Sequence, residues 1–98
     1  MFDTNKLRKF VKDYEQYQEL RHQLKRPADQ ARALAKQAIT LMRQDKFQEG
    51  KRLLADAERI LKSVQTLLKR QSLLASEGFF REALEEYVEA KAYSSFFT

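Results

Sequence analysis

The sequence predicts an all-α protein: an antiparallel helical bundle made by a single domain of 98 residues. Apolar residues recur at intervals of three and four along most of the chain, as they do on one face of an α-helix. The chain contains two Gly and one Pro, so few positions interrupt a helix. No segment alternates apolar and polar residues as a half-buried strand does. We therefore assign every regular element to a helix.

The first predicted helix runs from about Thr4 to Lys25, with Thr4 as its expected N-cap. Its apolar stripe consists of Leu7, Phe10, Val11, Tyr14, Tyr17, Leu20 and Leu24. Pro27 lacks a backbone N–H and is predicted to kink the long helix or to restart it there. The next run carries small side chains that let another helix approach closely, at Ala28, Ala31, Ala35, Ala38 and Met42.

A further helix is expected after Asp45, which is its predicted N-cap. Its apolar positions are Phe47, Gly50, Leu54, Ala57, Leu61, Val64 and Leu68. Gly50 lies on this seam and is expected to permit close helix contact. Residues 71–76 form the predicted connection, and Ser76 or Glu77 is expected to begin the last helix. That helix is the most aromatic part of the chain, and its end is expected to need cover from another subunit or from further chain.

Composition excludes several classes of protein. The chain has no cysteine, so disulfides, thiolate metal sites and thiol nucleophiles are excluded. No apolar run approaches the roughly 20 residues that a membrane span requires, and we expect a cytoplasmic protein. Residues 1–76 carry 17 Lys and Arg against nine Asp and Glu, whereas residues 77–98 carry two against five. A basic body of this kind favours polyanions such as nucleic acid.

The acidic part of the chain is concentrated on one side of the last predicted helix. Helical geometry places four carboxylates within an arc of about 100°, namely Glu82, Glu85, Glu86 and Glu89. Like charges three and four residues apart repel one another. We therefore expect a counter-charge from outside the helix, which is either a divalent cation or a neighbouring basic surface.

The segment Glu86-Tyr87-Val88-Glu89-Ala90 resembles the EYVEA signature of the translin family, on the side of translin-associated factor X (TRAX). The run from Arg32 to Ile39, followed by Met42 and Arg43, is similar to the long first helix of that family. The resemblance covers most of the chain and corresponds to the amino-terminal half of a typical member. It implies an all-α subunit that assembles into closed hollow oligomers, either of one kind of chain or with a translin-like partner.

The resemblance also implies a function. Translin-family proteins bind single-stranded RNA or DNA, and the TRAX type is a metal-dependent endoribonuclease. It implies that Glu86 and Glu89 are the catalytic ligands of Mg²⁺ or Mn²⁺. Glu82 lies one turn before Glu86 and is expected to be an accessory ligand or an outer-shell acceptor. The alternative is that all four glutamates form a solvated face. Residues at i and i+3 share one helix face, which suits two ligands of one hard cation. In the family, a further acid comes from a later helix that this sequence does not contain.

Nucleic-acid contacts are predicted on the first half of the chain. Arg32, Lys36 and Arg43 share a helix side and could follow phosphates, with Arg21 continuing the charge upstream. For each of these residues, the alternative is an ordinary charged side chain that faces solvent. A different class of function remains open, namely a non-catalytic helical scaffold or adaptor that mediates protein–protein contacts, in which the aromatic C-terminal helix docks on a partner and the glutamates pair with the partner's basic residues. Binding to nucleic acid would weaken steeply with salt, whereas apolar docking would not.

Overall fold

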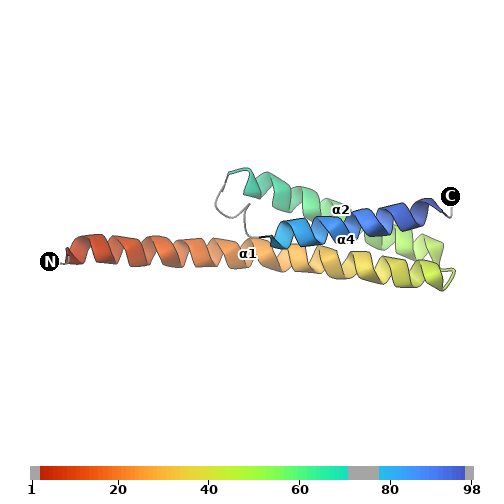
Figure 1. The fold of residues 1–98 in the computed structure, drawn as a ribbon, viewed down its shortest axis with the longest axis horizontal. Coiled ribbons are helices and arrows are strands. Elements are labelled where there is room, and N and C mark those ends of the chain that lie inside the picture. Colours follow the sequence, from red (N-terminus) through yellow and green to blue (C-terminus); the bar gives the residue numbers. More distant parts are fainter. Residues whose placement is uncertain (1–2, 71–77, 97–98) are drawn as a thin grey trace.

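The computed structural model describes residues 3–70 and 78–96, which form three helices packed into an elongated bundle. The helices are α1 (Thr4–Arg43), α2 (Phe47–Leu68) and α4 (Phe79–Ser95), and the molecule measures 66 × 18 × 17 Å. The predicted all-α bundle is confirmed (Figure 1). Within the described residues, no helix combines the length and the apolar character needed to cross a membrane.

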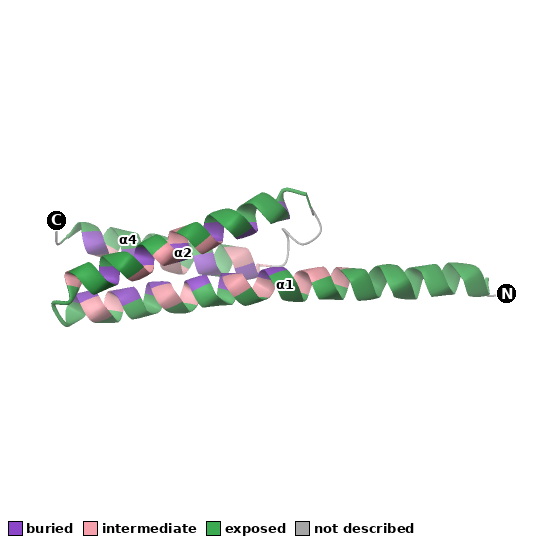
Figure 2. Ribbon diagram, turned by 180° about the vertical axis from the view of Figure 1, so that it is seen from behind, coloured by how far each residue is buried: buried purple, intermediate pink, exposed green. Residues whose placement is uncertain are grey.

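The three helices run alternately up and down the bundle. α2 returns along α1 in the antiparallel sense, and α4 then runs parallel to α1 (Figure 1). α2 and α4 cover only the C-terminal part of α1. The N-terminal part of α1 projects beyond both, and residues 4–16 are exposed on all sides of the helix (Figure 2). We call residues 4–19 of α1 the arm.

The core follows a heptad-like seam on each of the first two helices. α1 buries Leu24, Ala28, Ala31, Ala35, Ala38 and Met42, and α2 buries Gly50, Leu54, Ala57, Leu61, Val64 and Leu68. Both sets alternate by four and three, which is the spacing of positions a and d in a bundle. The α4 helix adds Phe79, Ala83 and Ala90 to this core. Because four of the six buried residues of α1 are alanines, the neighbouring helices can approach its backbone closely.

Gly50 shows how close this approach is. A β-carbon built at Gly50 would lie 2.9 Å from Met42 Cγ and 3.1 Å from the carbonyl oxygen of Ala38. Carbon atoms in contact are normally about 3.5–4.0 Å apart. The prediction that Gly50 permits close helix contact is therefore confirmed.

Of the two outcomes predicted at Pro27, a kink or a restart, the restart does not occur, because α1 is one helix of 40 residues that passes through Pro27 and is drawn without a break in Figure 1. The missing N–H of Pro27 leaves the carbonyl of Gln23 without its helical donor. Gln23 is exposed, so water can supply that donor. Buried Leu24 and Ala28 on either side of Pro27 belong to one core cluster, and this packing holds the helix continuous.

The helix ends also differ from the predicted caps. Asp3, rather than Thr4, caps α1, because its Oδ1 accepts a hydrogen bond of 3.0 Å from the backbone N–H of Asn5. Asp45 does not cap α2, whose N-cap is Lys46. It ends α1 with φ 64°, in the left-handed region. The N–H of Asp45 donates to the carbonyl of Met42 and that of Lys46 to the carbonyl of Leu41, which is a Schellman motif.

The last helix begins after Gly78, which has φ 88° and precedes Phe79. Glycine adopts this conformation without the steric cost that a β-carbon imposes. The predicted starts at Ser76 and Glu77, and the predicted connection over residues 71–76, lie outside the described residues.

Candidate functional site

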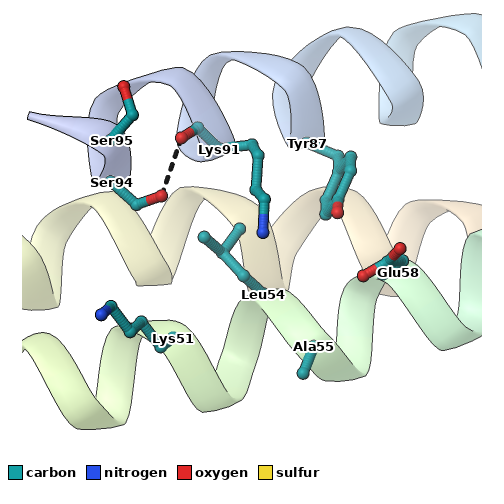
Figure 3. A pocket seen from close by; sticks show the side chains of 8 residues that line it. All are labelled: Lys51, Leu54, Ala55, Glu58, Tyr87, Lys91, Ser94 and Ser95. Carbon is teal, nitrogen blue, oxygen red and sulfur yellow. Dashed lines mark hydrogen bonds between the residues drawn. The ribbon is translucent and has the colours of Figure 1, made fainter. Parts of the chain in front are cut away.

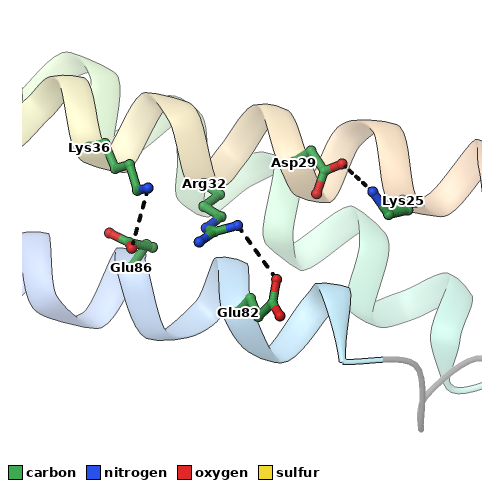
Figure 4. Close-up of polar contacts among 6 residues, drawn as sticks. All are labelled: Lys25, Asp29, Arg32, Lys36, Glu82 and Glu86. Carbon is green, nitrogen blue, oxygen red and sulfur yellow. Dashed lines mark hydrogen bonds and ion pairs between the residues drawn. The ribbon is translucent and has the colours of Figure 1, made fainter.

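The structure brings two of the predicted phosphate-binding residues and two of the predicted metal ligands together on one face, between α1 and α4. Arg32 Nη1 lies 3.5 Å from a carboxylate oxygen of Glu82, and Lys36 Nζ lies 3.8 Å from Glu86 Oε1 (Figure 4). One helical turn separates the two pairs on each helix, as parallel packing requires. Within this chain, α1 is therefore the basic surface that balances these two glutamates.

The burial of these pairs sets their energetic weight. The side chains of Arg32 and Glu82 are 40% and 62% exposed, and an exposed ion pair contributes roughly 0–1 kcal/mol. Glu86 is more enclosed, at 21% side-chain exposure. Arg32 Nε is buried and has no hydrogen-bond partner, so only the outer part of this guanidinium is paired. These two ion pairs therefore contribute more to the register of α4 on α1 than to the stability of the fold.

The other two predicted phosphate contacts lie elsewhere on α1. The guanidinium carbon of Arg43 lies 5.7 Å from the centre of the Tyr93 ring on α4, within cation–π distance. Arg21 is half-buried and lies near the base of the arm, well upstream of Arg32. Three of the four predicted cations thus contact α4, and the four do not form one continuous solvent-facing stripe.

The predicted metal ligands do not assemble a complete site in the described residues. Glu89 is exposed, Glu86 is paired with Lys36, and Glu85 pairs with Arg81 at 3.5 Å. No group of three or more His, Asp or Glu side chains capable of holding a cation occurs in residues 3–70 and 78–96. Mg²⁺ prefers octahedral oxygen coordination, so these carboxylates on one helix do not fit it by themselves.

The EYVEA segment is largely occupied by contacts within the bundle. Ala90 is fully buried, and Val88 is 55% exposed on the outer side of α4. Tyr87 packs against the core, and its ring lines a groove together with Glu58 of α2. Packing thus accounts for Tyr87 and Ala90 without any ligand.

A shallow groove between α2 and α4 contains a polar contact that the sequence did not reveal. Its walls carry Lys51 and Glu58 from α2 and Tyr87 and Lys91 from α4, with Leu54 between them (Figure 3). Lys62 Nζ lies 3.3 Å from Glu58. The only signal in the sequence was that a tyrosine on an apolar face needs a partner for its hydroxyl.

The electrostatics of this groove are those of a structural contact. The ion pair with Lys62, followed by the nearby hydroxyl of Tyr87, lowers the pKa of Glu58. Burial, and then the charge of Glu58, raise the pKa of Tyr87. Both shifts move the pKa of the group further from neutral pH, whereas efficient acid–base catalysis needs a pKa near the working pH. Neither group is suited to proton transfer.

The arm carries the clearest unpartnered surface of the described chain. Leu7, Phe10, Val11 and Tyr14 have exposed fractions of 48%, 67%, 45% and 55%. These residues continue the same seam that is buried from Leu24 to Met42, so their spacing is that of a packed helix. Tyr17 and Leu20, at the base of the arm, pack partly against the core. The predicted apolar stripe is real, but the described residues leave its first half uncovered (Figure 2).

Comparisons with known proteins identify no relative of this chain. No family model, curated protein or solved structure matches the chain. The class is therefore defined by the fold, which in residues 3–70 and 78–96 is a bundle of three helices with a projecting helical arm.

Proposed function

We propose that this chain is a helical interaction module, a scaffold or adaptor that binds another helix through the apolar stripe of its arm. The observation that carries this proposal is the exposure of Leu7, Phe10, Val11 and Tyr14 on a seam that is otherwise packed. Four large apolar side chains at helical spacing form an anchor of the kind used in helix recognition. Large contiguous apolar surface is unusual on a protein that has no partner. The cytoplasm is the expected compartment.

Site-specific photo-cross-linking in cells tests the proposal. A photoreactive phenylalanine at Phe10 is expected to give discrete adducts, and mass spectrometry is expected to map the cross-linked residue to an amphipathic helix. The same group at Val88 serves as the matched control, because Val88 is also exposed but lies on α4, outside the arm. Adducts that are absent at Phe10, or equally strong at both positions, would contradict the proposal.

Binding of single-stranded RNA or DNA is the second candidate, supported by the net charge of +5 and by the translin-like segment. In this case Arg32 and Lys36 would exchange their carboxylates for phosphates. Replacing the competing acids by Glu82→Gln and Glu86→Gln is then expected to tighten binding of a short oligonucleotide. Lys36→Gln is expected to weaken it and to reduce the slope of log affinity against log salt by about one. Unchanged affinity in all three variants would argue against phosphate binding on this face.

The endoribonuclease expectation keeps Glu86 and Glu89 as the proposed ligands of Mg²⁺ or Mn²⁺, in an assembly that supplies further oxygen ligands. Titration with Mn²⁺ is the direct test, with Glu86→Ala and Glu89→Ala expected to abolish binding and Glu85→Ala as the control on the same helix. Equal binding by all these variants would rule out the assignment.

A further inference from the structure

The helices α1 and α2 each carry a second apolar row beside their buried seam. The row repeats every seven residues and consists of Leu20, Pro27, Leu34 and Leu41 on α1, and of Leu53, Ile60 and Leu67 on α2. Six of these residues are half-buried, and Leu67 is 48% exposed. Half-buried residues accordingly run along both helices (Figure 2). We call these seven residues the α1–α2 face.

The α4 helix packs on the other side of this pair of helices. It contacts α1 at Arg32 and Lys36, each of which is two residues from Leu34 and hence about 160° away around the helix. It approaches α2 on the side of Glu58, which stands in the same relation to Ile60. Within residues 3–70 and 78–96, no third helix therefore lies over the α1–α2 face.

Uncharged side chains border the face on α1. Glutamine recurs at every seventh residue there, at Gln16, Gln23, Gln30, Gln37 and Gln44, and all five are exposed. The charged residues of α1 between positions 16 and 44 all occupy other positions of the seven-residue repeat. In a chain with 34% charged residues and a net charge of +5, this side of α1 carries no charge.

The glutamine row favours a second copy of the chain as the partner. A side-chain amide both donates and accepts hydrogen bonds, so a row of glutamines can pair with an identical row, whereas a row of like charges would repel its own copy. A polyanion or an anionic membrane is attracted by Lys and Arg, which this border lacks. Depletion of charge around an apolar centre is typical of contacts between proteins.

An antiparallel second copy makes the α1 borders match. Gln30 and Ile60 are each fifteen residues from Asp45 in the turn, so they lie level in the antiparallel pair of helices. A two-fold axis at this level places Gln30 beside its own equivalent and Gln23 beside Gln37 of the second copy. Gln23 donates one N–H to Glu19 at 3.1 Å and keeps its amide oxygen for such a contact.

The same axis matches the charges that border the face on α2. It brings Glu49 level with Arg70 of the second copy, and Asp56 level with Ser63 of the second copy. Asp56 is already paired with Arg59 of its own chain. No pair of like charges is thus opposed in this row, and one surface patch meets itself, as a two-fold symmetric dimer requires.

The face is large enough for a dimer. The stretch from Leu20 to Leu41 is about 32 Å long at 1.5 Å per residue, and the bundle is 18 Å across. Two copies packed face to face would bury roughly 1,200 Å² in total, which is the lower bound for a stable specific interface.

We infer that the α1–α2 face packs on the same face of a second copy of this chain, with α1 antiparallel to α1 and the two-fold axis near Gln30 and Ile60. The inference goes beyond the proposed function, because it uses another surface. In this arrangement Leu7 and Phe10 of each arm project beyond the second copy and stay open to a different partner.

Sedimentation equilibrium of the whole chain tests the pairing. The unmodified protein is expected to form a dimer, and Leu67→Glu is expected to weaken its association at least about tenfold, because symmetry places the substitution in the interface twice. Leu84→Glu is the matched control, since Leu84 is 40% exposed but lies on α4, and it is expected to leave the association unchanged. Circular dichroism verifies that both variants keep their helices. A monomeric unmodified protein, or equal association of the two variants, would overturn the inference.

A charge swap at Gln30 tests the position of the axis without touching an apolar residue. Gln30→Glu and Gln30→Lys are each expected to weaken the dimer about fivefold, because like charges then meet at the axis. An equimolar mixture of the two variants is expected to restore association. The same two changes at Gln48, which is exposed on α2 outside the face, are expected to have no effect. A mixture that associates no better than either Gln30 variant alone would overturn the inference.

Failure of this inference is distinguishable from failure of the proposed function. A monomeric chain whose photoreactive group at Phe10 still captures another helix would exclude the second copy and leave the interaction module standing. A dimer that Leu67→Glu weakens, with no capture at Phe10, would do the reverse.

Discussion

Substitution of Gly50 by alanine tests whether the close contact between α1 and α2 holds the bundle together. In an exposed helix, Gly→Ala stabilises by up to about 1 kcal/mol. At Gly50 the new methyl group would lie 2.9 Å from Met42 Cγ and 3.1 Å from the backbone oxygen of Ala38. Overpacking of a core costs about 1–3 kcal/mol. The carbonyl oxygen belongs to the backbone of α1 and cannot easily move away from the new methyl group. We expect Gly50→Ala to lower the free energy of unfolding by about 1 kcal/mol.

Urea unfolding followed by circular dichroism measures this change, which corresponds to a melting temperature lower by roughly 4–8 °C in a domain of this size. The control is Ala55→Gly, at an exposed position on the same helix. This control measures only the difference in helix propensity between alanine and glycine, and it is expected to lower the free energy of unfolding by about 1 kcal/mol. If Gly50→Ala instead stabilised the protein by the amount that Ala55→Gly destabilised it, the two helices would not be in contact there and the packing argument would be wrong.

Two further changes test local features of the fold. Asp45→Gly is expected to raise the free energy of unfolding by roughly 0.5–1 kcal/mol in a urea titration, because glycine adopts the left-handed φ of 64° without steric cost; a loss of stability would mean that the Asp45 side chain has a role of its own. Tyr87→Phe removes the hydroxyl beside Glu58 and is expected to lower the free energy of unfolding slightly at neutral pH. The pKa of Tyr87 is raised in the folded chain, so its contribution is full below the ordinary tyrosine pKa and is lost as pH rises beyond it. The pKa of Glu58 is lowered, so its contribution is present above the ordinary glutamate pKa and is lost as pH falls through the folded value. Melting temperatures across pH would show a flatter alkaline limb in Tyr87→Phe, and identical limbs in both proteins would refute the contact.

Much of the helical organisation was predictable because helix periodicity is local. The four–three spacing from Ala28 to Met42 and from Gly50 to Leu68 identified the buried seams, and the structure confirms them. The restart considered at Pro27 and the cap expected at Asp45 were both wrong for one shared reason. The sequence shows each residue's intrinsic preference, whereas packing on either side of Pro27 and the geometry of the turn at Asp45 decide the outcome.

The candidate site was less predictable. The sequence showed that Glu82 and Glu86 needed a counter-charge and left open whether a cation or a basic surface supplied it. Their partners Arg32 and Lys36 lie fifty residues earlier in the chain, and only the parallel packing of α4 on α1 brings them together. The contact between Glu58 and Tyr87 was hidden for the same reason, because it depends on the relative rotation of α2 and α4.

The sequence by itself determined that this protein is helical, where its apolar seams lie, and how charge is distributed along the chain. These properties follow from the order of side chains on a helix, whose geometry is fixed. Only the tertiary structure decided which part of each seam is covered. α2 and α4 bury the seam of α1 from Leu24 onward and stop there, so Phe10 and Tyr14 stay exposed because no described helix of this chain extends far enough to cover them.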